Sequence, residues 1–146
     1  MCKGFTVRPA QAGDGKELSR LLGELFPPAP LPGAAEEAIA ELAADPNALL
    51  LVAALPDGTL AGTAVGMACR DMCGACKRFL VIENVITCPR QRGKGIARAI
   101  FNELEAFAHR RECTYMLLVS GNEREEAHRF YEKMGFAREA GYRKFF

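Results

Sequence analysis

A short basic turn between an apolar strand and an amphipathic helix is the part of the chain best suited to chemistry. The turn spans residues 90–97 and has glycines at positions 93 and 95. Glycine lets the backbone approach a ligand closely, and the following helix offers unpaired N–H groups and the positive end of its dipole. We expect this turn to bind a phosphate group. The alternative is a tight connection with a solvated charge cluster.

Spacing excludes two familiar phosphate-binding loops. The turn lacks the Gly-Lys-Ser/Thr ending of a P-loop, and Gly93 and Gly95 are not followed by the third glycine of the dinucleotide fingerprint. Upstream, Glu83 interrupts an apolar strand over residues 79–87, where a carboxylate is costly to bury without a partner. Glu83 is therefore either a functional group or a structural one that pairs with an arginine or faces solvent.

Three of the six cysteines, Cys69, Cys73 and Cys76, are spaced C-x3-C-x2-C. The spacing resembles the iron–sulfur triad of radical S-adenosylmethionine enzymes. Those enzymes carry the triad after the first strand of a much larger barrel, whereas here it falls in a short connection midway along the chain. A structural zinc would need four ligands, so Cys88 or His109 would have to join. We expect reduced thiols and no metal.

Hydrophobic periodicity predicts the elements that must position these residues. Ile96, Ile100, Leu104 and Phe107 give the helix after the turn one inward face. The sequence Pro56-Asp57-Gly58 predicts an antiparallel hairpin, and glycines at 62 and 66 indicate a bulge or a close backbone approach. Asp14 and Glu17 predict a capping box.

We expect strands at residues 4–8, 48–55, 59–69, 79–87, 113–119 and 136–146, and helices beginning at Asp14 and spanning 34–44, 96–107 and 122–134.

Length and composition limit the class of protein. The chain has 146 residues, of which 49% are hydrophobic, and suits one α/β domain over residues 1–146. Its 19 basic and 18 acidic residues give a net charge of +1, which offers no general attraction for nucleic acid or acidic membranes. Neither a membrane-spanning run nor a signal peptide is evident, so we expect a cytoplasmic protein.

The turn and the last helix together resemble the GNAT N-acetyltransferase superfamily. Its signature is Arg or Gln, two residues, Gly, one residue, then Gly or Ala, and Arg92, Gly95 and Ala97 fill these places. Residues 127–136, AHRFYEKMGF, are similar to the family's A-x-x-x-Y-E-K-x-G-F. The resemblance covers nearly the whole chain. It implies an α/β fold whose mixed, centrally antiparallel sheet has helices on both faces and a parallel strand pair splayed around acetyl-CoA.

The resemblance also implies contacts with acetyl-CoA. The backbone of the turn would hold the pyrophosphate, and the end of the preceding strand would pair with the pantetheine arm. Many relatives carry Asn three residues before the Ala of the helix signature. Here that residue is an arginine, which could reach a phosphate instead, and Asn122 lies close by. The implied contacts are Val85, Ile86, Thr87, Arg92, Gly93, Lys94, Gly95, Ile96, Ala97, Asn122 and Arg124.

Acyl transfer from a thioester to an amine needs an uncharged amine, a polarised carbonyl and a proton for the leaving thiolate. Glu83 is the candidate base, and strand alternation predicts that Glu83, Val85 and Thr87 share one side. Tyr131 is the candidate acid through the resemblance, although a tyrosine on an apolar helical face is otherwise a core residue. Neither His109 nor His128 falls on the apolar stripe of its helix, so both are expected to face solvent.

The expected reaction is direct attack of a primary amine on acetyl-CoA in a ternary complex. Residues 124–131 look like the helix of aminoalkylphosphonate N-acetyltransferases, which implies a small anionic amine as acceptor. We expect its pocket to combine the loop at residues 27–33, the connection carrying Cys73, and the closing strand. The alternatives are a non-catalytic acyl-CoA-binding regulatory module and a protein N-terminal or lysine acetyltransferase. The sequence also leaves open whether the protein forms a homodimer.

Overall fold

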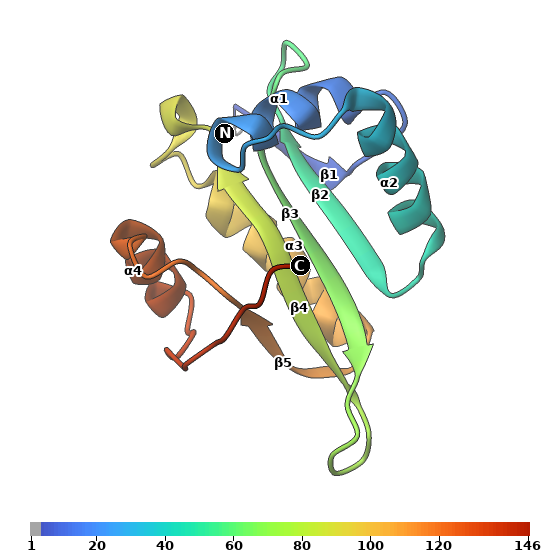
Figure 1. Ribbon diagram of the computed structural model, residues 1–146, viewed down its shortest axis with the longest axis vertical. Helices are drawn as coiled ribbons and strands as arrows, with labels where there is room; N and C mark the ends of the chain where they lie inside the picture. Colours follow the sequence, from blue (N-terminus) through green and yellow to red (C-terminus); the bar gives the residue numbers. More distant parts are fainter. Residues whose placement is uncertain (1–3) are drawn as a thin grey trace.

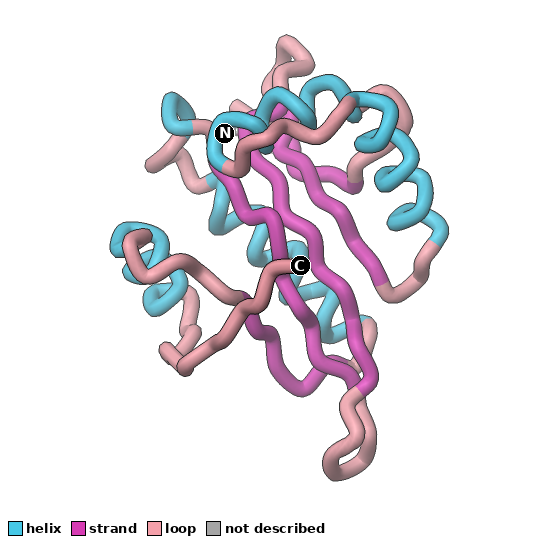
Figure 2. The backbone as a smooth tube through the Cα atoms, in the orientation of Figure 1, coloured by secondary structure: helices cyan, strands magenta, loops and turns pink. Residues whose placement is uncertain are grey.

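The computed structural model describes residues 4–146. In chain order, its elements are β1 (Thr6–Pro9), α1 (Gly15–Leu25), α2 (Pro32–Ala44), β2 (Ala48–Ala54), β3 (Leu60–Arg70), β4 (Arg78–Thr87), the 3-10 helix η1 (Pro89–Gln91), α3 (Ile96–Arg110), β5 (Cys113–Leu118) and α4 (Glu125–Lys133). The strands form one sheet in the order β1-β2-β3-β4-β5 (Figures 1 and 2).

The sheet is mixed, as the sequence predicts. Strands β1 to β4 pair antiparallel with their neighbours, and the predicted hairpin joins β2 to β3. Strand β5 pairs with β4 in parallel, because the chain crosses back along α3 between the two strands. Two strands that end at the same edge can diverge there, and this edge is also where α3 begins.

Helices cover both faces of the sheet. Helices α1 and α2 lie over one face and α3 over the other (Figure 1). Under α1 and α2, Leu18, Leu21 and Ile39 form one buried cluster with the sheet. Under α3, the predicted inward stripe forms a second and larger cluster, which also receives side chains from α4. The predicted stripe is confirmed, because Ile96, Ile100, Leu104 and Phe107 are all buried.

Small residues on β3 allow α3 to lie close to the sheet. A Cβ atom at Gly62 would be 2.7 Å from Cγ2 of Ile96, and one at Gly66 would be 2.9 Å from Cδ2 of Leu104. The predicted close approach is therefore confirmed at both glycines. Because Ile96 opens α3, the contact at Gly62 also determines where the basic turn sits above the sheet.

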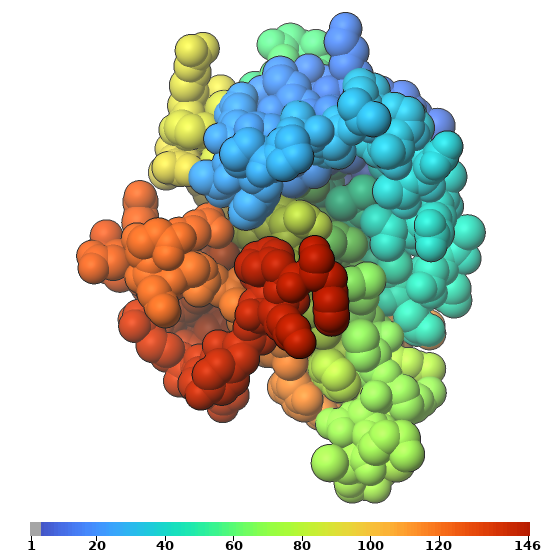
Figure 3. All heavy atoms as spheres, in the orientation of Figure 1, coloured from blue at the N-terminus to red at the C-terminus, as the bar shows by residue number. Residues whose placement is uncertain are grey.

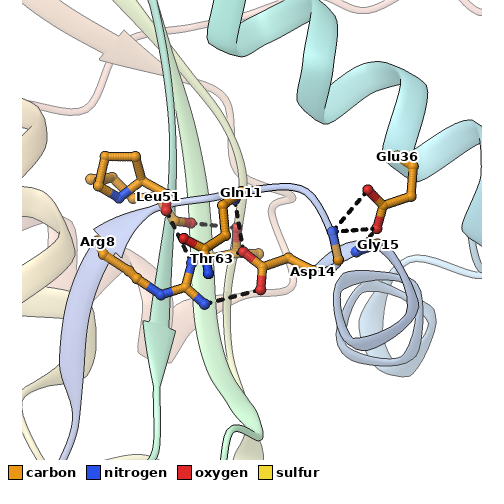
Figure 4. A network of polar contacts seen from close by, with 9 residues as sticks. Arg8, Gln11, Asp14, Gly15, Glu36, Leu51 and Thr63 are labelled. Atoms are coloured by element: carbon orange, nitrogen blue, oxygen red, sulfur yellow. Dashed lines mark hydrogen bonds and ion pairs between the residues drawn. The ribbon is translucent and has the colours of Figure 1, made fainter.

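The N-terminus of α1 differs from the predicted capping box. Asp14 holds the N-cap position, but its carboxylate accepts from Arg8 Nη1 at 2.7 Å and from the amide of Gln11 at 2.8 Å. Glu36 of α2 instead accepts from the amide of Gly15 at 2.7 Å (Figure 4). The capping box was wrong because both carboxylates have other partners: that of Asp14 accepts from Arg8 and Gln11, and that of Glu17 accepts from the amide of Leu60 at 3.1 Å.

Helix α2 and the predicted closing strand also differ from the prediction. Helix α2 begins at Pro32, earlier than residue 34, because the first helical position tolerates proline. Residues 136–146 form no strand (Figure 2). They contain Tyr142, Phe145 and Phe146, which are 98%, 80% and 114% exposed. Aromatic residues favour strands where a half-buried pleated surface receives them, and these side chains have no such surface.

Candidate active site

The basic turn adopts a conformation that only glycine accommodates easily. Gly93 has φ +76° and Gly95 has φ +84°, both in the left-handed region. Gly95 is the N-cap residue of α3. A Cβ atom at either glycine would meet nothing within 4 Å. The glycines are therefore needed for the path of the backbone, and the space beside them is open to a ligand.

The amides from Gly93 to Arg98 donate no hydrogen bond to any residue in the range 4–146. The first intrahelical bond at this end runs from the amide of Ala99 to the carbonyl of Gly95 at 3.0 Å. Unpaired amides at a helix N-terminus, together with the helix dipole, favour an anion. A diphosphate fits this row of donors. Among the predicted contacts here, Ile96 contributes its amide, since its side chain is buried in the core.

The side chains of the turn leave the amides accessible. Arg92, Gly93, Lys94 and Gly95 are exposed, and Ala97 is partly buried. Lys94 Nζ donates to Gln91 Oε1 at 2.8 Å. A surface pocket of about 290 Å³ borders the start of α3, and its lining includes the basic residues Lys94 and Arg98. Neither Glu83 nor Tyr131 lines this pocket. The turn thus offers positive charge in addition to its free amides.

Strands β4 and β5 diverge below this turn. Their last paired residues are Ile82 and Leu118. Strand β4 continues to Thr87, so its final residues, which include the predicted contacts Val85, Ile86 and Thr87, have no partner on β5. A strand edge of this kind presents N–H and C=O groups to an extended ligand. The predicted splayed parallel pair is therefore present.

A β-bulge in β4 changes the direction of the predicted base. Thr63 pairs with Ile86 and Val65 with Glu83, so two residues of β4 lie opposite Ala64 alone. One of these is Asn84, with φ +55°. An extra residue in one strand reverses the alternation of the side chains that follow it.

The reversal is visible in the packing. Ile82 and Val85 both belong to the cluster under α3, whereas Ile86 belongs to the cluster under α1 and α2. Glu83 alternates with Ile82 and therefore faces the side of α1 and α2. The prediction that Glu83 shares a side with Val85 and Thr87 was wrong. The extra residue between them arises from pairing with β3, which the sequence of β4 alone does not reveal.

Tyr131 lies on the other face of the sheet. The residue is 7% exposed, and its ring packs against Phe101, with the centroids 5.8 Å apart, and against Phe136 at 6.0 Å. Its hydroxyl makes no hydrogen bond within residues 4–146. Burial raises the pKa of Tyr131 above its ordinary value, and the positive charge of Arg124 opposes this shift. The phenol is therefore protonated at neutral pH and can donate a proton.

The connection between β5 and α4 holds the two remaining predicted contacts. Arg124 occupies the N-cap position of α4, which begins later than the predicted residue 122, and Asn122 is exposed in the turn before it. Arg124 influences the pKa of Tyr131, so its charge lies at the same end of the site. Both residues remain candidates for binding the cofactor.

Sequence reasoning missed two residues in the same connection. Ser120 follows β5, and its buried hydroxyl has no hydrogen-bond partner in the described part of the chain. His128 was expected to face solvent, but it is half-buried and its Nε2 lies 2.8 Å from the carbonyl oxygen of Gly121. The apolar stripe of a helix predicts which residues contact the core, but it does not predict a contact with a neighbouring loop such as that of His128. The Ser-Gly pair after an apolar strand was the available signal.

The described cysteines are Cys69, Cys73, Cys76, Cys88 and Cys113, and all are free thiols. Within residues 4–146, no group of three or more His, Cys, Asp and Glu residues is arranged to hold a metal ion. None of the helices in this range has the length and apolar character needed to cross a bilayer.

Comparisons with known proteins agree with this geometry. The model of the acetyltransferase (GNAT) family matches residues 16–136. An acetyltransferase from Trypanosoma brucei is similar at 26% identity with a TM-score of 0.84, over 97% of this chain and 99% of that one. Glucosamine-6-phosphate N-acetyltransferase from Arabidopsis thaliana shares the fold at 20% identity and a TM-score of 0.85, over 97% of each chain. No curated protein matches the sequence.

A further solved structure contains a cofactor analogue. The enzyme AAC(6')-Iy, in complex with the bisubstrate analogue CoA-S-monomethyl-acetylneamine, shares the fold at 19% identity and a TM-score of 0.78, over 97% of this chain and 98% of its own. The chain belongs to the GNAT acetyltransferase family and is an acetyl-CoA-dependent acyltransferase. The residues present fit that co-substrate, because the free amides of the turn suit its diphosphate and the unpaired edge of β4 suits its amide-bearing arm.

Proposed function

We propose that this chain, as one catalytic domain, transfers the acetyl group of acetyl-CoA to the primary amine of a small molecule by direct attack in a ternary complex. The observation that carries the proposal is the row of free amides from Gly93 to Arg98, which stands at the open end of the unpaired β4 edge. A diphosphate held there directs the rest of acetyl-CoA along β4. The thioester is then placed between the two diverging strands.

Two proton transfers accompany the reaction. The amine must lose a proton to become nucleophilic, and the leaving thiolate must gain one. Glu83 and Tyr131 suit these two tasks because the bulge directs the carboxylate to one face of the sheet while the phenol lies on the other. We propose Glu83 as the base for the acceptor and Tyr131 as the acid for the sulfur. An acceptor that attacks from the side of Glu83 would leave the sulfur on the side of Tyr131.

The acceptor site lies on the face of Glu83 in this proposal. Figure 1 shows the C-terminal segment crossing that face near β4, opposite the loop between α1 and α2. Figure 3 shows β4 atoms at the surface between these two segments. The segment contains Arg143 and Lys144, whose positive charges suit an anionic amine. These charges would attract a small anionic amine toward the face of Glu83.

A thiol-release assay with acetyl-CoA tests the proposal. The acceptors would be small amines, aminophosphonates, amino acids, lysine peptides and peptides with free N-termini. We expect turnover with a small amine and little with the peptides, and Glu83→Gln should lower kcat about 10- to 100-fold without changing the Kd for acetyl-CoA. Preference for peptides would instead indicate a protein acetyltransferase. Tight cofactor binding without turnover of any acceptor would indicate a non-catalytic binding module.

A further inference from the structure

Ser120 is partly buried, and its Oγ atom is the one fully buried side-chain oxygen or nitrogen in residues 4–146 that has no hydrogen-bond partner. The chain has two serines, and the other, Ser19, donates its hydroxyl to the carbonyl of Pro30. The buried hydroxyl of Thr63 donates to the carbonyl of Leu51 at 2.7 Å (Figure 4). A buried hydroxyl without a partner destabilises the free protein. Its presence calls for a partner supplied from outside the chain.

The position of Ser120 indicates where that partner lies. Leu118 forms the last pair between β5 and β4, and Ser120 follows two residues later, where the strands have separated. Across the gap lies the β4 edge that has no partner on β5, and beyond its end lie the free amides of the turn. Ser120 is therefore on the β5 side of the path that an extended ligand anchored at the turn would take.

The backbone that carries Ser120 is held in place by α4. Gly121, the next residue, accepts from the amide of Arg124 at 3.1 Å, and its carbonyl oxygen lies 2.8 Å from His128 Nε2. Nη2 of Arg138 lies 3.2 Å from His128 Nδ1. Because a guanidinium can only donate, Nδ1 is the acceptor, and Nε2 carries the proton given to Gly121. Since His128 and Tyr131 are three residues apart on α4, the same helix positions Ser120 and Tyr131.

Acetyl-CoA has polar groups that can pair with the hydroxyl of Ser120. Between its diphosphate and its thioester lies an arm with secondary amides, whose N–H and C=O groups need partners once they leave water. We propose that the hydroxyl of Ser120 hydrogen-bonds an amide of this arm in the bound state. The inference rests on the acetyl-CoA binding assigned above, and it adds a contact on β5 opposite the edge of β4.

Ser120→Ala tests the contact, with Ser19→Ala as its matched control. In the free protein, Ser120→Ala should leave the Tm unchanged or raise it, whereas Ser19→Ala should lower it, since only Ser19 loses an internal hydrogen bond. In calorimetry, Ser120→Ala should weaken the binding of CoA and acetyl-CoA about 5- to 15-fold. The Kd of 3′-phosphoadenosine 5′-diphosphate, which lacks the arm, should not change. Ser120→Thr, which keeps the hydroxyl, should restore most of the affinity.

Three results would overturn the proposal. The first is a Kd for CoA that is the same in Ser120→Ala and the unmodified chain, which would mean that water satisfies the hydroxyl. The second is a fall in Tm as large as that of Ser19→Ala, which would indicate a structural role. The third is an equal loss of affinity for the nucleotide that lacks the arm. Failure of the unmodified chain to bind CoA would instead contradict the assignment of the cofactor.

Discussion

In the part of the molecule built from β1, β2, α1 and α2, the fully buried polar side-chain atoms have partners within residues 4–146, whereas the part around β4, β5 and the start of α3 contains one that has none. In the first part, Asp14 and Glu36 have partners within the chain (Figure 4). Ser19 also has one. In the second, the amides of the turn, the end of β4 and the hydroxyl of Ser120 have none within residues 4–146.

This contrast separates stability from binding. Buried polar groups are normally paired, so the buried hydroxyl of Ser120 indicates a ligand. The free amides at the start of α3 are exposed, and they favour an anion. Substitutions in the closed part should change the free energy of unfolding and leave cofactor affinity alone. Substitutions in the open part should do the reverse. Each of the following predictions tests one side of the contrast.

The largest effect is expected for Gly95→Glu. The new side chain would be strained at φ +84° and would place a carboxylate beside amides that suit an anion. We expect the affinity for acetyl-CoA to fall at least about 100-fold in calorimetry. Gly58→Glu is the matched control, because Gly58 has φ +87° and equally open surroundings but lies in the β2–β3 hairpin. If both variants lost affinity equally, backbone strain rather than the site would explain the result.

Tyr131→Phe should affect turnover more than binding. Loss of the phenol proton should lower kcat about 100-fold or more, with little change in the Kd for acetyl-CoA. Because burial raises the pKa of Tyr131, the phenol should stay protonated to high pH. Activity that depends on its proton should therefore decline only above pH 10. Tyr142→Phe, at an exposed tyrosine, is the control. Unchanged kcat in Tyr131→Phe would remove the phenol from the mechanism.

Asp14→Asn should affect stability alone. We expect it to lower the free energy of unfolding at pH 7 by about 1–3 kcal/mol, measured in urea, without changing cofactor affinity. The hydrogen bonds from Arg8 lower the pKa of Asp14 below its ordinary value of 3.8. The folded protein therefore binds this proton more weakly than the unfolded chain does. The stabilisation is complete above pH 3.8 and is lost as the pH falls through the lowered pKa.

Consequently, the difference between the unmodified chain and Asp14→Asn should shrink in strong acid. Glu24→Gln is the control, because Glu24 pairs with Arg20 in a more exposed ion pair. It should cost less than about 0.5 kcal/mol at pH 7. A difference for Asp14→Asn that persisted unchanged at about pH 2, below the usual carboxyl range, would show that lost packing rather than lost charge explains it.

Local patterns predicted most of the fold and the cofactor turn. The inward stripe of α3, the β2–β3 hairpin and the glycines of the turn each depend on residues close together in sequence, and the structure agrees with all three. Predictions that depended on distant partners did worse, as the capping box at Asp14 and the closing strand show.

The order of strands and helices as far as α4, the amphipathic face of α3 and the anion-binding turn follow from the amino-acid sequence, because periodicity and glycine conformation act over a few residues. The tertiary structure alone decided the direction of Glu83, since the bulge at Asn84 exists through pairing with β3. It also decided that the hydroxyl of Ser120 is buried without a partner while that of Ser19 has one. Register and hydrogen-bond satisfaction depend on segments far apart in the chain, which meet only when it folds.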